Sequence, residues 1–233
     1  MISPIANSFR EILEDIFFLI FPKFCYACNQ ALVTGEDMMC SKCLLDLPRV
    51  SLHDELEIFN RLNGRIPLQF ALSFFKFQKG GKMQQLLHNL KYKNIPTLGV
   101  ALGRICGQEI QKRDFSPTFD YIIPVPLHPR RFRKRGYNQS YQFAQGLSDI
   151  LQIPVLDILI RTVPTTTQTR KTKLIRWENV NHVFRLGFDK NLEGHHVLLV
   201  DDVMTTGATL EACGAVILSA GSPSLSVATI AWA

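Results

Sequence analysis

The chain has 233 residues, of which 46% are hydrophobic and 20% charged, and its formal net charge is +6. This composition is typical of a globular protein and excludes a collagen-like, coiled-coil or wholly disordered chain. No apolar stretch approaches the roughly 18 residues that a membrane-spanning helix requires, so we expect a soluble, cytoplasmic protein without membrane insertion.

Four of the six cysteines form two Cys-x-x-Cys pairs, Cys25 with Cys28 and Cys40 with Cys43. Two such pairs can supply four thiolates to one tetrahedral Zn²⁺ ion, and a site closed by four cysteines is structural rather than catalytic. The alternative, a redox-active or disulfide-bonded pair, is disfavoured in a cytosolic chain. Residues 1–60 are therefore predicted to form an N-terminal helix and a small zinc-binding domain that needs its metal to fold.

Residues 61–233 alternate between strand-like and helix-like patterns. β-rich or continuously apolar runs predict strands at residues 70–77, 121–125, 197–200 and 225–232. Apolar residues at helical spacing predict helices at residues 83–90, 97–112, 138–150 and 210–218. Strands separated by helices favour an α/β domain with a mainly parallel sheet over residues 61–233.

The segment that follows the strand at 197–200 carries the strongest functional pattern. Two acids, Asp201 and Asp202, come first, and small or hydroxylated residues then open a helix: Thr205, Thr206, Gly207, Ala208 and Thr209. Ligands of open parallel sheets bind beyond the carboxyl ends of the strands, where N–H groups at a helix start can hold a phosphate. The carboxylates can accept hydrogen bonds from sugar hydroxyls or help to hold hydrated Mg²⁺. The loop is therefore predicted to bind a ribose 5-phosphate group.

Two alternatives explain less of this pattern. Strand-end solvation with helix capping needs one acid rather than two, and it does not need the Thr-Gly-Ala-Thr run. Dinucleotide-binding and NTP-cleaving proteins use Gly-x-Gly-x-x-Gly or Gly-x-x-x-x-Gly-Lys-Ser/Thr motifs, and the sequence contains neither in the required context.

The apolar run, the two acids and the Thr-Thr-Gly-Ala-Thr loop resemble the phosphoribosyl pyrophosphate (PRPP) motif of type I phosphoribosyltransferases. Further segments resemble the ComF family, whose members are phosphoribosyltransferase-like proteins linked to natural competence and DNA uptake. These segments are the cysteine pairs and residues 90–92, 124–131, 135–140, 161–168 and 176–180. The resemblance covers nearly the whole chain.

The resemblance implies a type I phosphoribosyltransferase-like fold preceded by a zinc-ribbon-like domain. It implies that Asp201 and Asp202 lie at the ribose hydroxyls during catalysis and that residues 205–209 hold the 5-phosphate. Lys91, Arg130 and Arg131 are implied on the pyrophosphate side, with Mg²⁺ bound together with PRPP. The chain departs from the family pattern at Lys171 and at residues 182–183, in a segment expected to be a mobile loop.

Basic residues gather in two segments of the chain. Residues 1–60 hold 9 acids and 4 bases, whereas residues 61–233 hold 11 acids and 22 bases, a balance that favours an anionic partner. Phe132 and Tyr137 accompany the densest cluster of cations: Arg130, Arg131, Arg133, Lys134 and Arg135. Arginines can grip pyrophosphate, but cations interleaved with aromatic rings also resemble a single-stranded DNA surface. Residues 161–176 form a second, acid-free stretch and a predicted flexible loop. For any single arginine the alternative is a solvated basic surface.

Two compatible hypotheses follow. In the first, the chain binds PRPP and, if active, transfers phosphoribose to an unidentified acceptor with loss of pyrophosphate. In the second, it is a competence accessory protein that binds single-stranded DNA and keeps a regulatory or vestigial PRPP pocket. Proteins of competence and DNA uptake are then expected partners.

Overall fold

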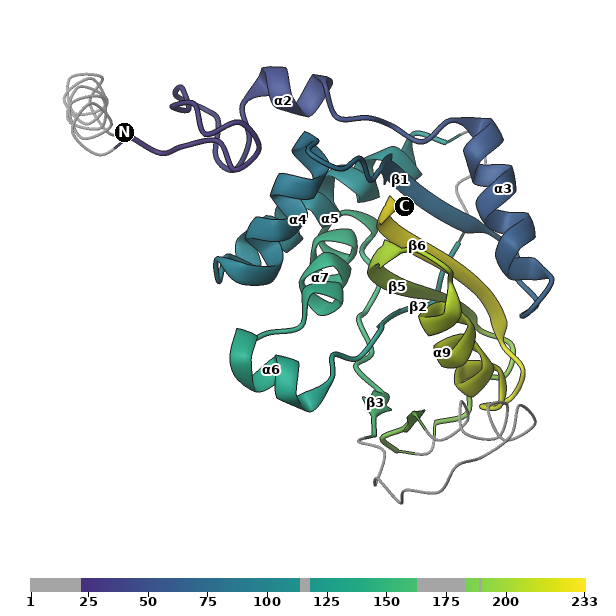
Figure 1. Cartoon of the computed structure of the whole chain (residues 1–233). Helices are drawn as coiled ribbons and strands as arrows, with labels where there is room; N and C mark the ends of the chain where they lie inside the picture. The colour runs from purple at the N-terminus through teal and green to yellow at the C-terminus, as the bar shows by residue number, and fades with distance from the viewer. Residues whose placement is uncertain (1–21, 114–117, 163–182, 189) are drawn as a thin grey trace, which may run out of the picture.

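The computed structural model describes residues 22–113, 118–162, 183–188 and 190–233. Its centre is a sheet of four parallel strands in the order β1, β6, β5, β2 (Figure 1). The strands are β1 (Ala71–Lys76), β2 (Tyr121–Pro124), β5 (His196–Met204) and β6 (Ser224–Trp232). A short antiparallel pair, β3 (Leu159–Arg161) and β4 (Phe184–Leu186), lies outside this sheet.

Helices cover both faces of the sheet, and the strands are apolar on both sides as a result. In β5, Leu198 and Val200 face one hydrophobic cluster and Val197 and Leu199 face the other, and all four are 0% exposed. The first cluster contains α4 (Lys82–Tyr92), α5 (Pro96–Gln111) and α7 (Gln139–Leu151), and the second contains α3 (Leu52–Asn63) and α9 (Ala208–Leu218). The predicted fold class, a mainly parallel sheet with flanking helices, is confirmed.

The connections after β2 and β5 diverge. The chain that leaves β2 returns through α7 on one face of the sheet, whereas the chain that leaves β5 returns through α9 on the other face. The carboxyl ends of two adjacent strands from which the chain diverges in this way border a crevice, which is the usual ligand site of an open α/β sheet. Here that position lies between β2 and β5.

Helices α5 and α7 pack backbone against backbone through glycines. A Cβ atom at Gly103 would lie 2.3 Å from the carbonyl oxygen of Phe143, and one at Gly146 would lie 2.1 Å from that of Val100. Any side chain at either position would therefore force the helices apart. This contact fixes α7, and with it the residues that begin α7, relative to α5.

The predicted strand at 197–200 is longer in the structure than in the sequence analysis. β5 continues through both acids to Met204, because β6 extends alongside it and pairs Asp201 with Thr229 and Met204 with Trp232. The acids are therefore held by sheet pairing and do not lie in the loop itself. The loop is correspondingly short, from Thr205 to Gly207.

The four-cysteine segment packs against the sheet domain. Cys25 and Cys43 belong to the same hydrophobic cluster as α4, and Asn89 Nδ2 donates a hydrogen bond to the carbonyl of Tyr26 at 2.8 Å. The short helix α2 (Ser41–Leu45) follows directly. Helix α3 crosses the predicted domain boundary at residue 60 and packs its buried Ile58 on the sheet side, so the division at residue 60 remains a prediction.

Two expectations concern residues that are not described. The predicted N-terminal helix is not assessed because residues 1–21 lie outside the described part of the chain, and most of the loop predicted at 161–176, together with Lys171 and His182, falls within residues 163–182, which are also not described. Among the described helices, none is long and apolar enough to cross a lipid bilayer.

Candidate functional site: a cationic cavity at the carboxyl end of the sheet

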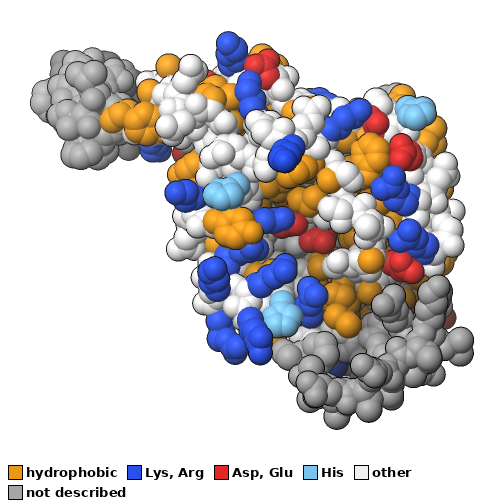
Figure 2. All heavy atoms as spheres, viewed as in Figure 1, with side chains coloured by type: hydrophobic (Ala, Val, Ile, Leu, Met, Phe, Trp, Pro, Cys, Tyr) orange, Lys and Arg blue, Asp and Glu red, His pale blue; other side chains and the backbone are white. Residues whose placement is uncertain are grey.

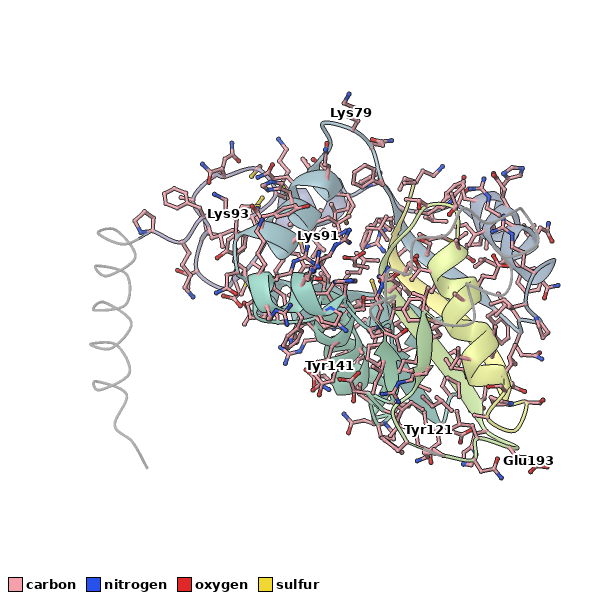
Figure 3. The ribbon with its side chains drawn as sticks, turned by 60° about the horizontal axis from the view of Figure 1, so that its bottom comes forward. Lys79, Lys91, Lys93, Tyr121, Tyr141 and Glu193 are labelled. Carbon is pink, nitrogen blue, oxygen red and sulfur yellow. The ribbon has the colours of Figure 1, made fainter. Side chains whose placement is uncertain are left out.

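A cavity of about 790 Å³ opens at the carboxyl ends of β2 and β5. In Figure 2 acidic side chains lie in a hollow surrounded by lysine and arginine side chains. In Figure 3 Lys91 lies near the middle of the molecule, away from Tyr121, the first residue of β2, and Glu193 at the lower right. The lining comes from the ends of β2, β3 and β5 and from helices α4, α6, α7 and α9. Its charged members are Lys91, Arg131, Arg133, Lys134, Arg135, Arg161, Asp201 and Asp202.

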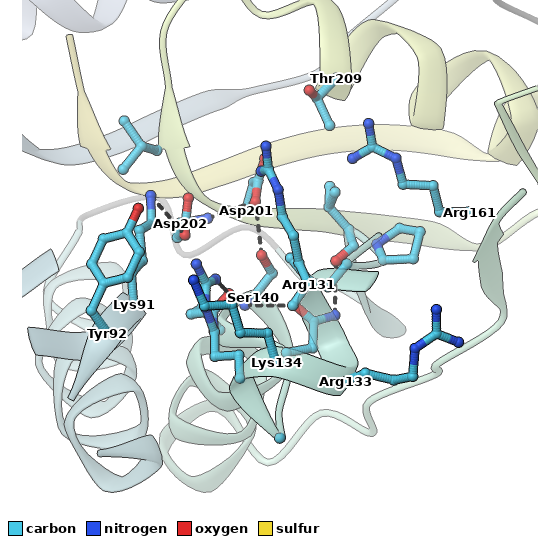
Figure 4. A pocket seen from close by; sticks show the side chains of 18 of the residues that line it. Lys91, Tyr92, Arg131, Arg133, Lys134, Ser140, Arg161, Asp201, Asp202 and Thr209 are labelled. Atoms are coloured by element: carbon cyan, nitrogen blue, oxygen red, sulfur yellow. Dashed lines mark hydrogen bonds and ion pairs between the residues drawn. The ribbon is translucent and has the colours of Figure 1, made fainter. Parts of the chain in front are cut away.

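The two acids at the base of the cavity have different partners (Figure 4). Asp202 forms an ion pair with Lys91, whose Nζ lies 3.0 Å from Asp202 Oδ2. Asp201 Oδ1 instead accepts hydrogen bonds from the Ser140 hydroxyl at 2.7 Å and from the backbone N–H of Asp202 at 2.8 Å. Ser140 is 4% exposed and lies at the start of α7, so a buried hydroxyl orients the carboxylate.

These surroundings change the acidity of Asp201. Burial of its carboxyl group, followed by the negative charge of Asp202, raises the pKa of Asp201 to about 7, although the hydrogen bond from Ser140 and the charge of Lys91 act in the opposite direction. Near neutral pH one carboxyl group of the cavity can thus gain or lose a proton. A pKa in this range suits a group that takes part in binding or proton transfer.

The basic segment predicted at 130–135 forms a helix, α6 (Pro129–Arg135). His128 caps it by accepting the N–H of Arg130 at 3.1 Å, Pro129 begins it, and Gly136 ends it in the left-handed conformation at φ +81°. Cations in the last turn stabilise the helix C-terminus. The helix presents Arg131, Arg133, Lys134 and Arg135 to the cavity, whereas Arg130 is exposed and does not line it.

Tyr137 does not have the exposed position that was predicted for stacking on DNA bases. Its ring is 8% exposed, and its hydroxyl donates a hydrogen bond to the carbonyl of Leu90. Burial of Tyr137 against α4 does not favour the stacking role predicted for it. The exposed aromatic side chains of this region are Tyr92, at 65%, and Phe132, at 49%. Tyr92 lies beside Arg135, whose guanidinium carbon is 5.6 Å from its ring centroid.

The predicted phosphate loop, residues 205–209, lies only partly at the cavity. The rest of it lies on the side that faces α3. Thr209, at the start of α9, lines the cavity. Thr205, Thr206 and Ala208 are exposed and do not line it, and Gly207 is buried with φ +80°. The carbonyls of Thr205 and Thr206 point toward Arg61 of α3 and Arg65, which follows the end of α3.

Ser140 and Arg161 were not predicted as site residues, although both lie in segments that carried the family resemblance. Ser140 was one polar residue among several at the start of a predicted helix, and only the fold brings it to Asp201. Arg161 ends β3 and lies over the ring of Phe184 at 5.3 Å, from where it also lines the cavity. Burial of a polar residue at the start of a helix points to a site residue, but that burial is visible only in the structure.

The four cysteines converge on one point, as predicted. Their Sγ atoms all lie within 4.8 Å of one another, and those of Cys28 and Cys40 are 3.8 Å apart. A Zn–S distance of about 2.3 Å places the sulfur atoms of a tetrahedral site roughly 3.8 Å apart, so the residues fit zinc. Burial would raise the pKa of Cys25, but hydrogen bonds from backbone N–H groups, first that of Cys40, lower it to about 7. Cys106 and Cys213 are buried elsewhere.

Comparisons with known proteins agree with this architecture. Residues 138–232 match the family model described as phosphoribosyl transferase domain. The DNA utilization protein YhgH of Salmonella typhi is 29% identical over 90% of this chain and 96% of its own length. Competence protein F of Haemophilus influenzae is 34% identical over 62% of this chain and 58% of its own length. Competence protein ComFC of Bacillus subtilis is 24% identical over 91% of this chain and 85% of its own length.

These relatives confirm the resemblance to ComF-type proteins. The matched residues 138–232 include α7, β5, α9 and β6, and with them Ser140, both acids and the loop that follows the acids. The chain is therefore similar over most of its length to proteins named for competence and DNA utilization, and it contains a segment that matches the phosphoribosyl transferase domain.

Proposed function

We propose that this chain binds PRPP in the cavity between β2 and β5 and, with a suitable acceptor, transfers its phosphoribosyl group with loss of pyrophosphate. The observation that carries the proposal is the pair Asp201 and Asp202 at the base of a cavity whose rim is cationic. Carboxylates can accept hydrogen bonds from ribose hydroxyls, while the rim can hold phosphate groups.

Each part of PRPP has chemically suitable neighbours. The N–H groups of the loop that leads to Thr209, the loop residue that lines the cavity, suit the 5-phosphate. The cations of the lining suit the pyrophosphate: Arg131, Arg133, Lys134, Arg135 and Arg161. Asp202, which is 15% exposed and faces the cavity, offers the oxygen ligands that Mg²⁺ prefers. Mg²⁺ bound with PRPP would neutralise charge on the pyrophosphate.

The residues of the chain would act mainly by positioning and electrostatics. Arginines of α6 neutralise the departing pyrophosphate, and the acids stabilise positive charge that develops on the ribose. Lys91 pairs with Asp202 at 3.0 Å, and because its ammonium group carries three N–H donors it can also donate to a phosphate oxygen of PRPP while Asp202 accepts from a ribose hydroxyl. The bond that breaks joins the anomeric carbon to the pyrophosphate oxygen, and the acceptor supplies the electron pair of the new bond.

Calorimetry with PRPP and Mg²⁺ tests this proposal. The double variant Asp201→Asn, Asp202→Asn should bind PRPP about 100-fold more weakly, which corresponds to about 2.7 kcal/mol. The matched control is Asp149→Asn, because Asp149 is an exposed acid paired with Arg104 outside the cavity. Wild-type protein that fails to bind PRPP, or a double variant that binds as tightly as wild type, would reject the proposal.

A second function has its own support, the cationic helix α6 with exposed Phe132 and nearby Tyr92. We propose that this surface binds single-stranded DNA, with phosphates at the cations and bases stacked on the rings. The names of the relatives, which refer to competence and DNA utilization, agree with this proposal. Competence and DNA-uptake proteins are then its proposed partners.

Salt dependence separates the two proposed functions. Each cation that no longer neutralises a phosphate of single-stranded DNA should reduce the slope of log affinity against log salt by about 0.7. The variant Arg133→Gln, Lys134→Gln removes two candidate cations, and Arg104→Gln, Lys112→Gln is a control with the same change in charge at α5, outside the cavity. An unchanged slope in the α6 variant, or no retardation of oligonucleotides at low salt, would reject DNA binding at α6.

A further inference from the structure

Helix α3 holds the β5–α9 loop from the side away from the cavity. Arg65 Nη1 donates a hydrogen bond to the carbonyl of Thr206 at 3.0 Å, and Arg61 Nη1 approaches that of Thr205 at 3.4 Å. Between the two arginines, Leu62 packs against Gly207, where an added Cβ would lie 2.5 Å from Leu62 Cδ2. The end of α3 and the turn that follows it therefore contact three successive residues of the loop.

The two carbonyl contacts determine where the loop N–H groups point. The described residues contain no cis peptide bond, and in a trans peptide the C=O and N–H groups point in opposite directions. Because the carbonyls of Thr205 and Thr206 face α3, the N–H groups of Thr206 and Gly207 face away from α3. None of the described residues of α3 lines the cavity, whereas Thr209 does. The N–H groups of Thr206 and Gly207 are thus left free of α3.

Arg65 also changes the charge at the start of α9. Its Nη1 lies 3.3 Å from Oε2 of Glu211, which is in the first turn of that helix. A free carboxylate there would repel a phosphate that approaches the helix N-terminus. The Arg65 guanidinium offsets the negative charge of Glu211 and also donates a hydrogen bond to the Thr206 carbonyl.

We propose that Arg65, assisted by Arg61, is a positioning residue that prepares the β5–α9 loop to bind a phosphate monoester. The inference rests on the proposed function. It adds a role for α3 and the turn after it, which lie outside the matched residues 138–232. Arg65 acts on the phosphate only through the loop backbone and through Glu211. The ligand group is the 5-phosphate end of a phosphorylated ribose.

The test compares three ligands by calorimetry: PRPP, ribose 5-phosphate and inorganic pyrophosphate. The variant Arg65→Ala should bind PRPP and ribose 5-phosphate about 3- to 10-fold more weakly. The effect should be no larger because Arg65 is partly exposed and solvent screens its contacts. Its affinity for pyrophosphate should be unchanged. Arg65→Lys should recover part of the affinity. Adding Glu211→Gln to Arg65→Ala should also recover part of it, since the unpaired carboxylate is removed. Arg104→Ala is the control for removal of a surface arginine.

The outcomes separate this inference from the proposed function. Wild-type protein that binds PRPP, together with Arg65→Ala that binds ribose 5-phosphate equally well, would overturn the inference and leave the proposed function standing. An equal reduction in affinity for all three ligands would also overturn it, because that result indicates general damage to the fold. Wild-type protein that binds pyrophosphate but neither ribose-containing ligand would reject both.

Discussion

Lys91 Nζ lies 3.0 Å from Asp202 Oδ2, so the two adjacent acids of the cavity do not share one electrostatic environment. Asp202 has a cation beside it, whereas Asp201 is partly buried and receives its hydrogen bonds from Ser140 and the backbone. The raised pKa of Asp201 follows from this difference, because its own burial and the charge of Asp202 both disfavour its ionisation.

Ser140→Ala should raise the pKa of Asp201 above its value of about 7, because the serine hydroxyl stabilises the charged carboxylate. Titration of the Asp201 side-chain carbon by NMR measures the shift. Stability at pH 8 should fall by about 1–2 kcal/mol and by less at pH 5, where Asp201 is protonated. Ser148→Ala, the same substitution later on α7, is the control and should leave the Asp201 titration unchanged. A titration that is identical in Ser140→Ala would contradict the role given to this hydroxyl.

Asp201→Asn should stabilise the protein at pH 8 and have little effect at pH 4. The folded protein holds the Asp201 proton up to about pH 7, while the unfolded chain releases it near its ordinary pKa of about 3.9. The wild-type contribution of this group to stability therefore falls as pH rises from about 4 to 7, and above that it is a constant penalty on the order of 4 kcal/mol. Urea unfolding at several pH values measures it. A difference between the two proteins that does not change with pH would show that Asp201 is not the titrating group.

Gly207→Ala should destabilise the protein by about 2–4 kcal/mol, because alanine is disfavoured at φ +80° and its Cβ would meet Leu62. Gly80→Ala measures the destabilisation that comes from the positive φ alone. Gly80 has φ +77° but nothing lies within 4 Å of an added Cβ, so its destabilisation should be about 1 kcal/mol. Thermal or urea unfolding measures both values. Equal destabilisation of the two variants would show that Leu62 yields to the added methyl group.

Removal of zinc should destabilise the sheet domain as well as the cysteine segment. Cys25 and Cys43 pack in the same cluster as α4, and Asn89 bonds to the backbone of Tyr26, so the two parts share contacts. Purified protein should contain about one zinc ion per chain, and Cys40→Ser should lose it and melt several degrees lower. Elemental analysis and calorimetric melting measure these effects. Chelator treatment should lower the melting temperature of wild type but not of Cys40→Ser, and wild type without bound metal would contradict the assignment.

Much of the fold could be predicted because its determinants are local. The run Val197–Val200 is apolar on every residue, which only a strand covered on both faces requires, and the cysteine spacing fixes a tetrahedral cluster wherever the segment lies. The extension of β5 to Met204 could not be predicted in this way. It depends on pairing with β6, a strand that begins 20 residues later.

The candidate site was predicted only in part, because some of its contacts join segments that are distant in the sequence. Both acids and Thr209 could be identified from the motif, but the buried position of Tyr137 and the contact of Ser140 with Asp201 arise from the packing of α7 against α4 and β5. The arginines near the end of α3 that contact Thr205 and Thr206 are more than 140 positions away in the sequence. No local pattern distinguishes them from other surface arginines.

The glycine contact between α5 and α7 has a consequence for how this protein can evolve. Because Gly103 and Gly146 meet each other's helix backbone, a larger residue at either position would displace the whole of α7, including Ser140 at its first turn. Acidity at the base of the cavity thus depends on two residues that do not line the cavity. Substitutions of exposed residues around the cavity opening can change its charge without moving α7. The proton affinity of Asp201, in contrast, depends on the packing of α5 against α7.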